Sequence, residues 1–153
     1  MIAALPVLLW ACQGGLYPVA PDTPERVTVG SPDPGGSPGS DPAPQEGPFG
    51  GQLVASGTHF LEFLGYTPPR GSYTLYLFPW GAGQSPIPAA LDATAKLKLS
   101  NGREIPMTAA TNSDDGSLFF YAVPEASFAS LNVTVQAEVT LGGTILTGSF
   151  SHP

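Results

Sequence analysis

One segment of the chain alternates apolar and polar residues without a break, from Leu131 to Leu141. Successive side chains of a β-strand point to opposite faces, so this alternation predicts a strand with one buried and one solvated face. Residues 92–99 show the same pattern, with Ala and Leu on the inward side. No segment shows a convincing helical period, and prolines at four positions between 86 and 124 would interrupt a helix. The sequence therefore predicts an all-β domain.

Turn signals divide the rest of this domain into strands. Asn101-Gly102 suits a type I′ hairpin turn, because both residues tolerate positive φ. Asp114-Asp115-Gly116 and Gly142-Gly143 mark two further turns. The expected strands are residues 52–55, 58–64, 72–78, 92–99, 103–109, 118–123, 131–141 and 144–151. Seven to eight strands at this spacing predict an immunoglobulin-like antiparallel β-sandwich over residues 51–153, with a small closed barrel as the alternative.

Residues 13–50 differ sharply from this domain in composition. They hold nine prolines and eight glycines. Such a stretch cannot bury enough apolar area to offset the conformational entropy that is lost on folding. We predict a disordered Pro/Gly-rich linker that acts as a spacer. A proline-rich ligand for a partner domain is the alternative, although residues 31–34 and 42–44 lack the flanking basic residues that such ligands often carry.

The chain begins with a short apolar run that ends beside its only cysteine, Cys12. The run is far shorter than the roughly 20 residues that span a bilayer, and it has the length of a signal-peptide apolar region. Leu9-Trp10-Ala11-Cys12 resembles the lipobox of bacterial lipoproteins, although no Lys or Arg precedes the run and Trp10 is bulky for its position. The resemblance implies that residues 1–11 are a signal peptide and that Cys12 carries a lipid.

The same resemblance implies a location in the bacterial cell envelope. A lipid on Cys12 would anchor the chain to a membrane, and residues 12–50 would link the anchor to the domain. Gln13 follows the cysteine in place of Asp, which is compatible with the periplasmic face of the outer membrane or the cell surface. A single cysteine excludes an internal disulfide and a zinc site built from cysteines.

Charge limits the classes of partner. The chain has 12 acidic and 5 basic residues, a net charge of -7, and no basic patch in either the linker or the domain. Nucleic-acid binding requires clustered Lys and Arg to neutralise phosphates, so nucleic acid is not an expected partner. The expected partners are the membrane, through the lipid, and an envelope protein or other ligand whose identity the sequence does not give.

The sequence shows no catalytic constellation. No serine lies in a Gly-x-Ser-x-Gly context. Asp114 and Asp115 are adjacent on a turn, whereas paired catalytic carboxylates face each other across a cleft. Residues 112–116 lack the ligand spacing of a calcium loop, so we interpret them as a plain acidic turn. We therefore expect neither enzyme activity nor a cofactor.

Two histidines carry an alternative function. Should the first and last strands be neighbours, His59 and His152 could approach each other and contribute to a copper or zinc site. Residues 49–153, with Gly57-Thr58-His59-Phe60-Leu61-Glu62-Phe63, resemble small periplasmic β-domains of bacterial metal-efflux and copper-handling systems. That resemblance implies transition-metal handling, but Phe49 stands where those domains often have a histidine. The plainer interpretation is a hydrogen-bonded His59 and a solvated His152 in the C-terminal tail.

Two irregular apolar connections are the best candidates for binding. Residues 78–88 contain Phe78 and Trp80, and residues 66–69 contain Tyr66. Loops on a rigid scaffold commonly carry function, and Trp and Tyr are frequent interface anchors. We predict a non-catalytic binding or accessory module that acts through these three side chains. Alternatively, Trp80 caps the open end of the sandwich core.

Overall fold

A computed structural model describes residues 23–24, 45–90 and 92–152 of the 153-residue chain. The predicted signal peptide, Cys12 and most of the predicted linker lie outside the described residues. Within the described ranges, no helix is long and apolar enough to cross a membrane.

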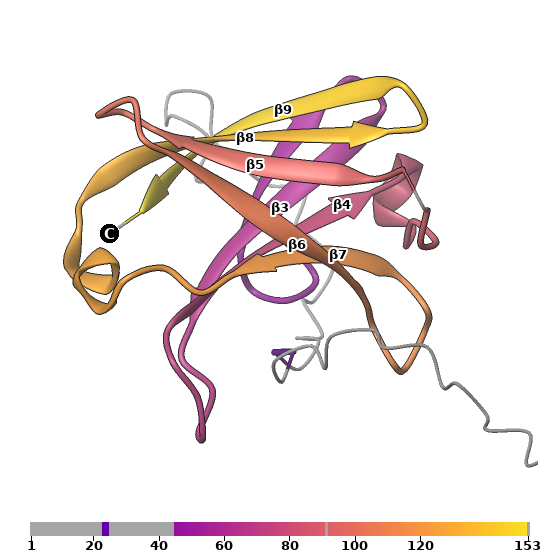
Figure 1. Ribbon diagram of the computed structural model, residues 1–153. Coiled ribbons are helices and arrows are strands. Elements are labelled where there is room, and N and C mark those ends of the chain that lie inside the picture. Colours follow the sequence, from indigo (N-terminus) through magenta and orange to yellow (C-terminus); the bar gives the residue numbers. More distant parts are fainter. Residues whose placement is uncertain (1–22, 25–44, 91, 153) are drawn as a thin grey trace, which may run out of the picture.

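The described residues form nine antiparallel strands and two short 3-10 helices, which confirms the all-β prediction (Figure 1). Each of the eight expected strands is present with slightly shifted ends, and the additional strand, β1, has two residues and is too short to show an alternation. The strands are β1 (Gln45–Glu46), β2 (Gln52–Ser56), β3 (His59–Tyr66), β4 (Thr74–Trp80), β5 (Thr94–Leu99), β6 (Glu104–Thr111), β7 (Leu118–Ala122), β8 (Val133–Leu141) and β9 (Thr144–His152), and the helices are η1 (Ala82–Gln84) and η2 (Ala126–Ser130).

The strands form one continuous curled sheet in the order β1-β2-β3-β4-β7-β6-β5-β8-β9. The continuity depends on β6, which pairs with β5 through residues 104–107 and with β7 through residues 108–111. Figure 1 shows β6 crossing diagonally from the β5–β8–β9 half to β7. Pro106 lies in the part of β6 that pairs with β5 alone, so its missing N–H breaks no ladder.

The two ends of the curled sheet approach each other. The Gln52 side chain of β2 forms hydrogen bonds with the backbone of Ser151 in β9. Further along the same two strands, the backbone N–H of Thr147 in β9 donates to Ser56 Oγ of β2 at 3.0 Å. These side-chain contacts hold the sheet as a half-barrel in which the β3–β4–β7 half faces the β5–β8–β9 half.

The space between the two halves is filled by a single main core. Most of its members are inward-facing residues of the alternating strands, and within β8 the alternation correctly predicted the burial of Val135, Ala137 and Val139, whereas Leu131 lies before the strand and is exposed. The largest contributions come from Leu61, Phe63, Leu75, Leu77 and Phe120 on one side and from Leu97, Val135, Val139, Leu146 and Phe150 on the other.

Two hairpins use different turns. Gly142 and Gly143 have φ values of +52° and +84°, as the two-residue type I′ turn between β8 and β9 requires. The prediction of the same turn at Asn101-Gly102 is wrong, because only Gly102 has a positive φ, +85°. The N–H of Gly102 donates to the Leu99 carbonyl at 2.9 Å, so the β5–β6 connection is a longer turn that ends in a left-handed glycine.

Candidate functional site

The outer surface of the β3–β4–β7 half carries an aromatic cluster, which we call the aromatic face. All seven residues of β4 are buried, although only alternate ones point into the main core. Tyr76, Phe78 and Trp80 point to the opposite side. A strand buried at every position has both of its faces covered, so the outside of β4 is also covered. The aromatic face comprises these three residues and Phe49, Leu53, Phe60, Leu64, Tyr66, Ala110, Phe119 and Tyr121.

The rings of the aromatic face form a row along β4. The ring centroids of Tyr76 and Phe78 are 6.0 Å apart at an interplanar angle of 9°, and those of Phe78 and Trp80 are 6.4 Å apart at 24°. Phe49 stacks on this row, 4.2 Å from Phe78 and 5.7 Å from Trp80. Stacked pairs of this kind each add about 0.5–1.5 kcal/mol beyond the area that they bury. The row is therefore a rigid platform.

Residues 45–51, which we call the amino-terminal arm, hold Phe49 on this platform. The arm pairs with β2 through β1 and then makes a tight turn. The N–H of Gly47 donates to the Gly51 carbonyl at 2.8 Å, and Gly50 turns the chain with a φ of +80°. The predicted boundary placed residues 45–50 in the linker, whereas in the structure they pack on the domain. The stacking of Phe49 on Phe78, together with the pairing of β1 with β2, holds these residues on the domain.

A buried carboxylate ties the arm to the sheet. Glu62 of β3 is 0% exposed. Its Oε1 accepts the N–H groups of Phe49 at 2.8 Å and Gly51 at 2.9 Å, and its Oε2 accepts the indole N–H of Trp80 at 3.0 Å. A buried charge is tolerated only where hydrogen bonds compensate its desolvation, and these donors do so. A methyl group on Gly47 would overlap the Glu62 carboxyl group, so the arm needs a glycine there.

The three predicted binding residues come together on the aromatic face. The prediction placed Phe78 and Trp80 in an irregular loop that begins at residue 78, but β4 continues through Trp80 and both side chains are at most 2% exposed. Pro79 lies opposite Leu61 of β3 and beyond the residues of β4 that pair with β7, so the strand has a partner on only one side at this proline. Tyr66, the last residue of β3, is half-buried at the border of the same face.

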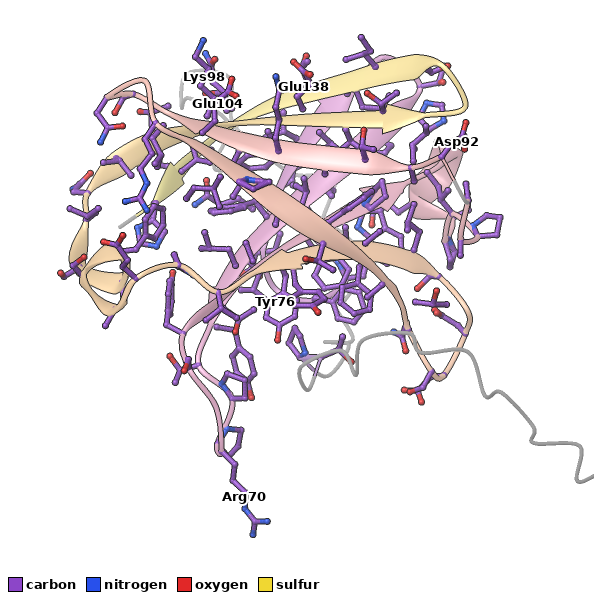
Figure 2. All side chains as sticks on the ribbon, in the orientation of Figure 1. Arg70, Tyr76, Asp92, Lys98, Glu104 and Glu138 are labelled. Carbon is purple, nitrogen blue, oxygen red and sulfur yellow. The ribbon has the colours of Figure 1, made fainter. Side chains whose placement is uncertain are left out.

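The other half of the sheet has a different outer surface, which we call the polar face. Its outward residues include Lys96 and Lys98 of β5, Gln136 and Glu138 of β8, and Thr147 and Ser149 of β9, and they line an open groove of about 480 Å³. Lys96 Nζ lies 3.6 Å from Glu104 Oε1 and 3.5 Å from Glu138 Oε1. Figure 2 shows Lys98, Glu104 and Glu138 on the opposite side of the domain from Tyr76. The groove mixes both signs of charge.

The structure does not bring the two histidines together. His59 lies opposite Ser56, whose Oγ contacts the backbone of Thr147. His152 lies five residues further along β9, a distance of about 16 Å at the usual rise of a strand. The ring nitrogen Nδ1 of His59 lies 3.3 Å from Thr58 Oγ1. No group of three or more His, Cys, Asp or Glu side chains within the described ranges is arranged to hold a metal ion.

His152 is buried rather than solvated, because the last residues of the chain pair with β8 as part of β9. Its Nδ1 is 2.6 Å from the Leu131 carbonyl oxygen and its Nε2 is 2.5 Å from the Tyr73 hydroxyl. A carbonyl only accepts, so Nδ1 carries a proton and Nε2 of a neutral ring accepts from Tyr73. The ring centroids of Phe128 and His152 are 4.8 Å apart in an edge-on arrangement. Burial raises the pKa of Tyr73. Both ring nitrogens are engaged by the domain itself.

The acidic turn between β6 and β7 is held by its own side chains. Asn112 Oδ1 accepts the N–H of Asp114, and Asp115 Oδ1 accepts the N–H of Ser117, both at 2.9 Å. Gly116 closes the turn with a φ of +70°. These local bonds agree with the interpretation as a plain turn.

Comparisons with known proteins give little to set beside this geometry. No protein-family model matches the sequence, and no curated protein sequence matches it. Among solved structures, a DUF4426 family protein from Pseudomonas aeruginosa PAO1 is similar to 65% of this chain and 93% of its own length, with 18% sequence identity and a TM-score of 0.44.

Proposed function

We propose that this protein is a lipid-anchored protein of the bacterial cell envelope that displays a non-catalytic β-domain as a binding or accessory module. The observation that carries the binding role is the aromatic face, where Trp80, Phe78 and Tyr66 lie on one surface outside the main core. Exposed apolar patches mark interaction sites, and this face would be such a patch wherever another segment of the chain did not cover it. Aromatic rows in particular bind extended peptide segments.

The aromatic face is not needed to complete the main core. That core is filled from the two inward faces of the half-barrel, and no member of the aromatic face belongs to it. The arm that covers part of the face is attached through the ring of Phe49, through hydrogen bonds to Glu62 and through the pairing of β1 with β2. The aromatic face is apolar, yet it contributes no residue to the main core. This separation supports a binding role for it over a role in core packing.

The anchoring part of the proposal rests on the lipobox-like Leu9-Trp10-Ala11-Cys12, which lies outside the described residues. As a flexible coil, residues 13–44 would let the domain reach about 30 Å from a lipid on Cys12. We also keep the immunoglobulin-like sandwich as the finer proposal for the fold, because the two halves of the sheet face each other across one core. The separation of His59 and His152 gives copper or zinc handling no comparable support.

Intact mass spectrometry of the protein made in a bacterial envelope tests the anchor. We expect a mature chain that begins at Cys12 and carries added lipid mass, and we expect both features to be lost in Cys12→Ala. An uncleaved chain without lipid would remove the envelope location from the proposal.

Photo-crosslinking in the same cells tests the binding role. A benzoylphenylalanine in place of Tyr66 puts the reactive group at the border of the aromatic face, and the same residue in place of Gln136 puts it on the polar face. We expect a discrete crosslinked product from position 66 alone. Equal products from the two positions, or none from position 66, would contradict a binding role for the aromatic face.

A further inference from the structure

The Tyr76 end of the aromatic face is as deeply buried as the end on which Phe49 stacks. Tyr76 is 0% exposed. Its ring neighbours among the described residues, Phe78 at 6.0 Å and Phe119 at 6.2 Å, belong to the same surface and lie beside it. The ring of Phe49 stacks on Phe78 and Trp80 further along the row. A tyrosine on the outside of a sheet is fully buried only when atoms lie over its ring, so a further segment packed over this end would account for the burial of Tyr76.

Thr23 and Pro24 are placed to be that segment. Pro24 is buried and Thr23 is half-buried, although twenty residues separate them from β1. Figure 1 draws this pair, in indigo, on the outer side of the β4–β7 strands. Figure 2 shows Tyr76 on that same side of the domain. A proline this far from the first strand is buried only if it lies against a surface, and the aromatic face is the apolar surface on that side.

We propose that the aromatic face binds a proline-rich segment in the polyproline II conformation, and that its occupant in the free protein is the chain's own segment around Pro24. This inference rests on the proposed function and names the class of ligand. Pro21 and Pro24 are three residues apart, which is the repeat of a polyproline II helix, so both rings would lie along one edge of such a segment. Extended proline-rich segments dock on aromatic-lined surfaces because they are already ordered before they bind.

The proposal has a consequence for any outside partner. A ligand joined to its site by a flexible connection acts at a local concentration in the millimolar range, so the chain's own segment would compete with a free peptide. A synthetic peptide with the sequence of residues 18–27 should therefore bind the Pro24→Ser variant about tenfold more tightly than it binds the unchanged chain.

Paramagnetic relaxation tests the self-docking directly. The 153-residue chain with Cys12→Ala and Thr23→Cys carries one spin label, at position 23. We expect the backbone amide signals of Tyr76, Phe119 and Tyr121 to lose most of their intensity, and those of residues 136 and 147 on the polar face to keep theirs. Adding Pro24→Ser should release the label, so that the two faces are broadened to the same extent. The matched change Pro38→Ser, in the same stretch of sequence, should leave the pattern as it was.

Two results would overturn the proposal. The twenty residues before β1 extend to about 66 Å, so an undocked label would reach both faces and broaden them evenly. Broadening of an unlabelled, isotope-enriched chain mixed with spin-labelled chains would mean that a second copy fills the face. Either result leaves the crosslinking test untouched, because a partner could be captured from position 66 whether or not Pro24 docks. Conversely, self-docking can be found when no partner is captured.

Discussion

The two outer faces of the half-barrel share one core and one strand geometry, yet they differ in what lies on them. On the polar face, residues alternate between core and solvent along β5 and β8, as an antiparallel sheet with one buried face requires. On the aromatic face, β4 is buried at every position. Folding of the main core explains the first pattern but not the second. Part of the additional burial comes from the arm, whose Phe49 stacks on Phe78 and Trp80.

One residue type shows the contrast most clearly. Glu62 on the aromatic face has no exposed surface and accepts hydrogen bonds from three N–H groups. Glu138 on the polar face has a side chain that is 45% exposed and pairs with Lys96 at 3.5 Å. Hydrogen bonds to a charged group contribute about 1.5–3 kcal/mol each, and exposed ion pairs contribute about 0–1 kcal/mol. A glutamate thus stabilises the fold strongly on the aromatic face, whereas a glutamate on the polar face contributes little to stability.

The largest expected effect comes from exchanging these two carboxylates for leucine. We expect Glu62→Leu to lower the free energy of unfolding by about 4 kcal/mol, because it leaves the N–H groups of Phe49, Gly51 and Trp80 buried without their acceptor. The matched change Glu138→Leu should cost less than about 1 kcal/mol. Urea unfolding followed by circular dichroism measures both. Equal costs would show that the two faces do not differ as their contacts indicate.

A glycine in the arm gives the next largest effect. Gly47→Ala should cost about 2 kcal/mol, because its methyl group would overlap the Glu62 carboxyl group. In a Glu62→Ala background the obstacle is absent, so the same change should cost less than about 0.5 kcal/mol. A double-mutant cycle by urea unfolding gives the coupling between the two positions. A cost that stays the same in both backgrounds would mean that the arm is held at Gly47 by something other than this carboxylate.

The sequence predicted the local parts of this comparison and missed the long-range ones. The strands were predictable because alternation and turn glycines act over a few residues. The run Thr74–Trp80 also held a usable signal, since a continuous apolar strand is buried on both faces. We interpreted its end as a loop instead. The lone acidic Glu62 between Leu61 and Phe63 was a second signal, because a carboxylate among apolar residues needs buried donors.

Other features could not be read from the chain. β6 divides its pairing between β5 and β7, and that choice depends on how the whole sheet curls rather than on residues 104–111. The solvated tail predicted for His152 was wrong for a similar reason, since its burial depends on pairing with Val133 and on Tyr73, which is 79 residues away. Nothing in the composition of residues 13–50 distinguishes the segment that packs on the domain from the rest.

Tyr73 lies outside both faces and tests whether a buried polar contact elsewhere behaves like Glu62. Tyr73→Phe removes the hydrogen bond to His152 and should cost about 1 kcal/mol at neutral pH. Burial raises the pKa of Tyr73, so the folded state holds this proton more firmly than the unfolded state. The resulting stabilisation is complete below the unfolded value of 10.0 and is lost as pH rises through the folded value. Urea unfolding across that pH range should show that the free energy of unfolding falls less steeply in the variant than in the unchanged chain. The same dependence on pH in both proteins would refute this account.

The smallest effect should come from the charged cluster on the polar face. Lys96 lies between Glu104 and Glu138, but all three side chains are between 42% and 52% exposed. Exposed pairs are screened by solvent, so Lys96→Met should change the free energy of unfolding by less than about 0.5 kcal/mol. In 1 M salt, where charges are screened beyond about 3 Å, the difference should disappear. A loss above about 1 kcal/mol that persists in salt would show that this face too is held by specific contacts, and the physical distinction between the two faces would then fail.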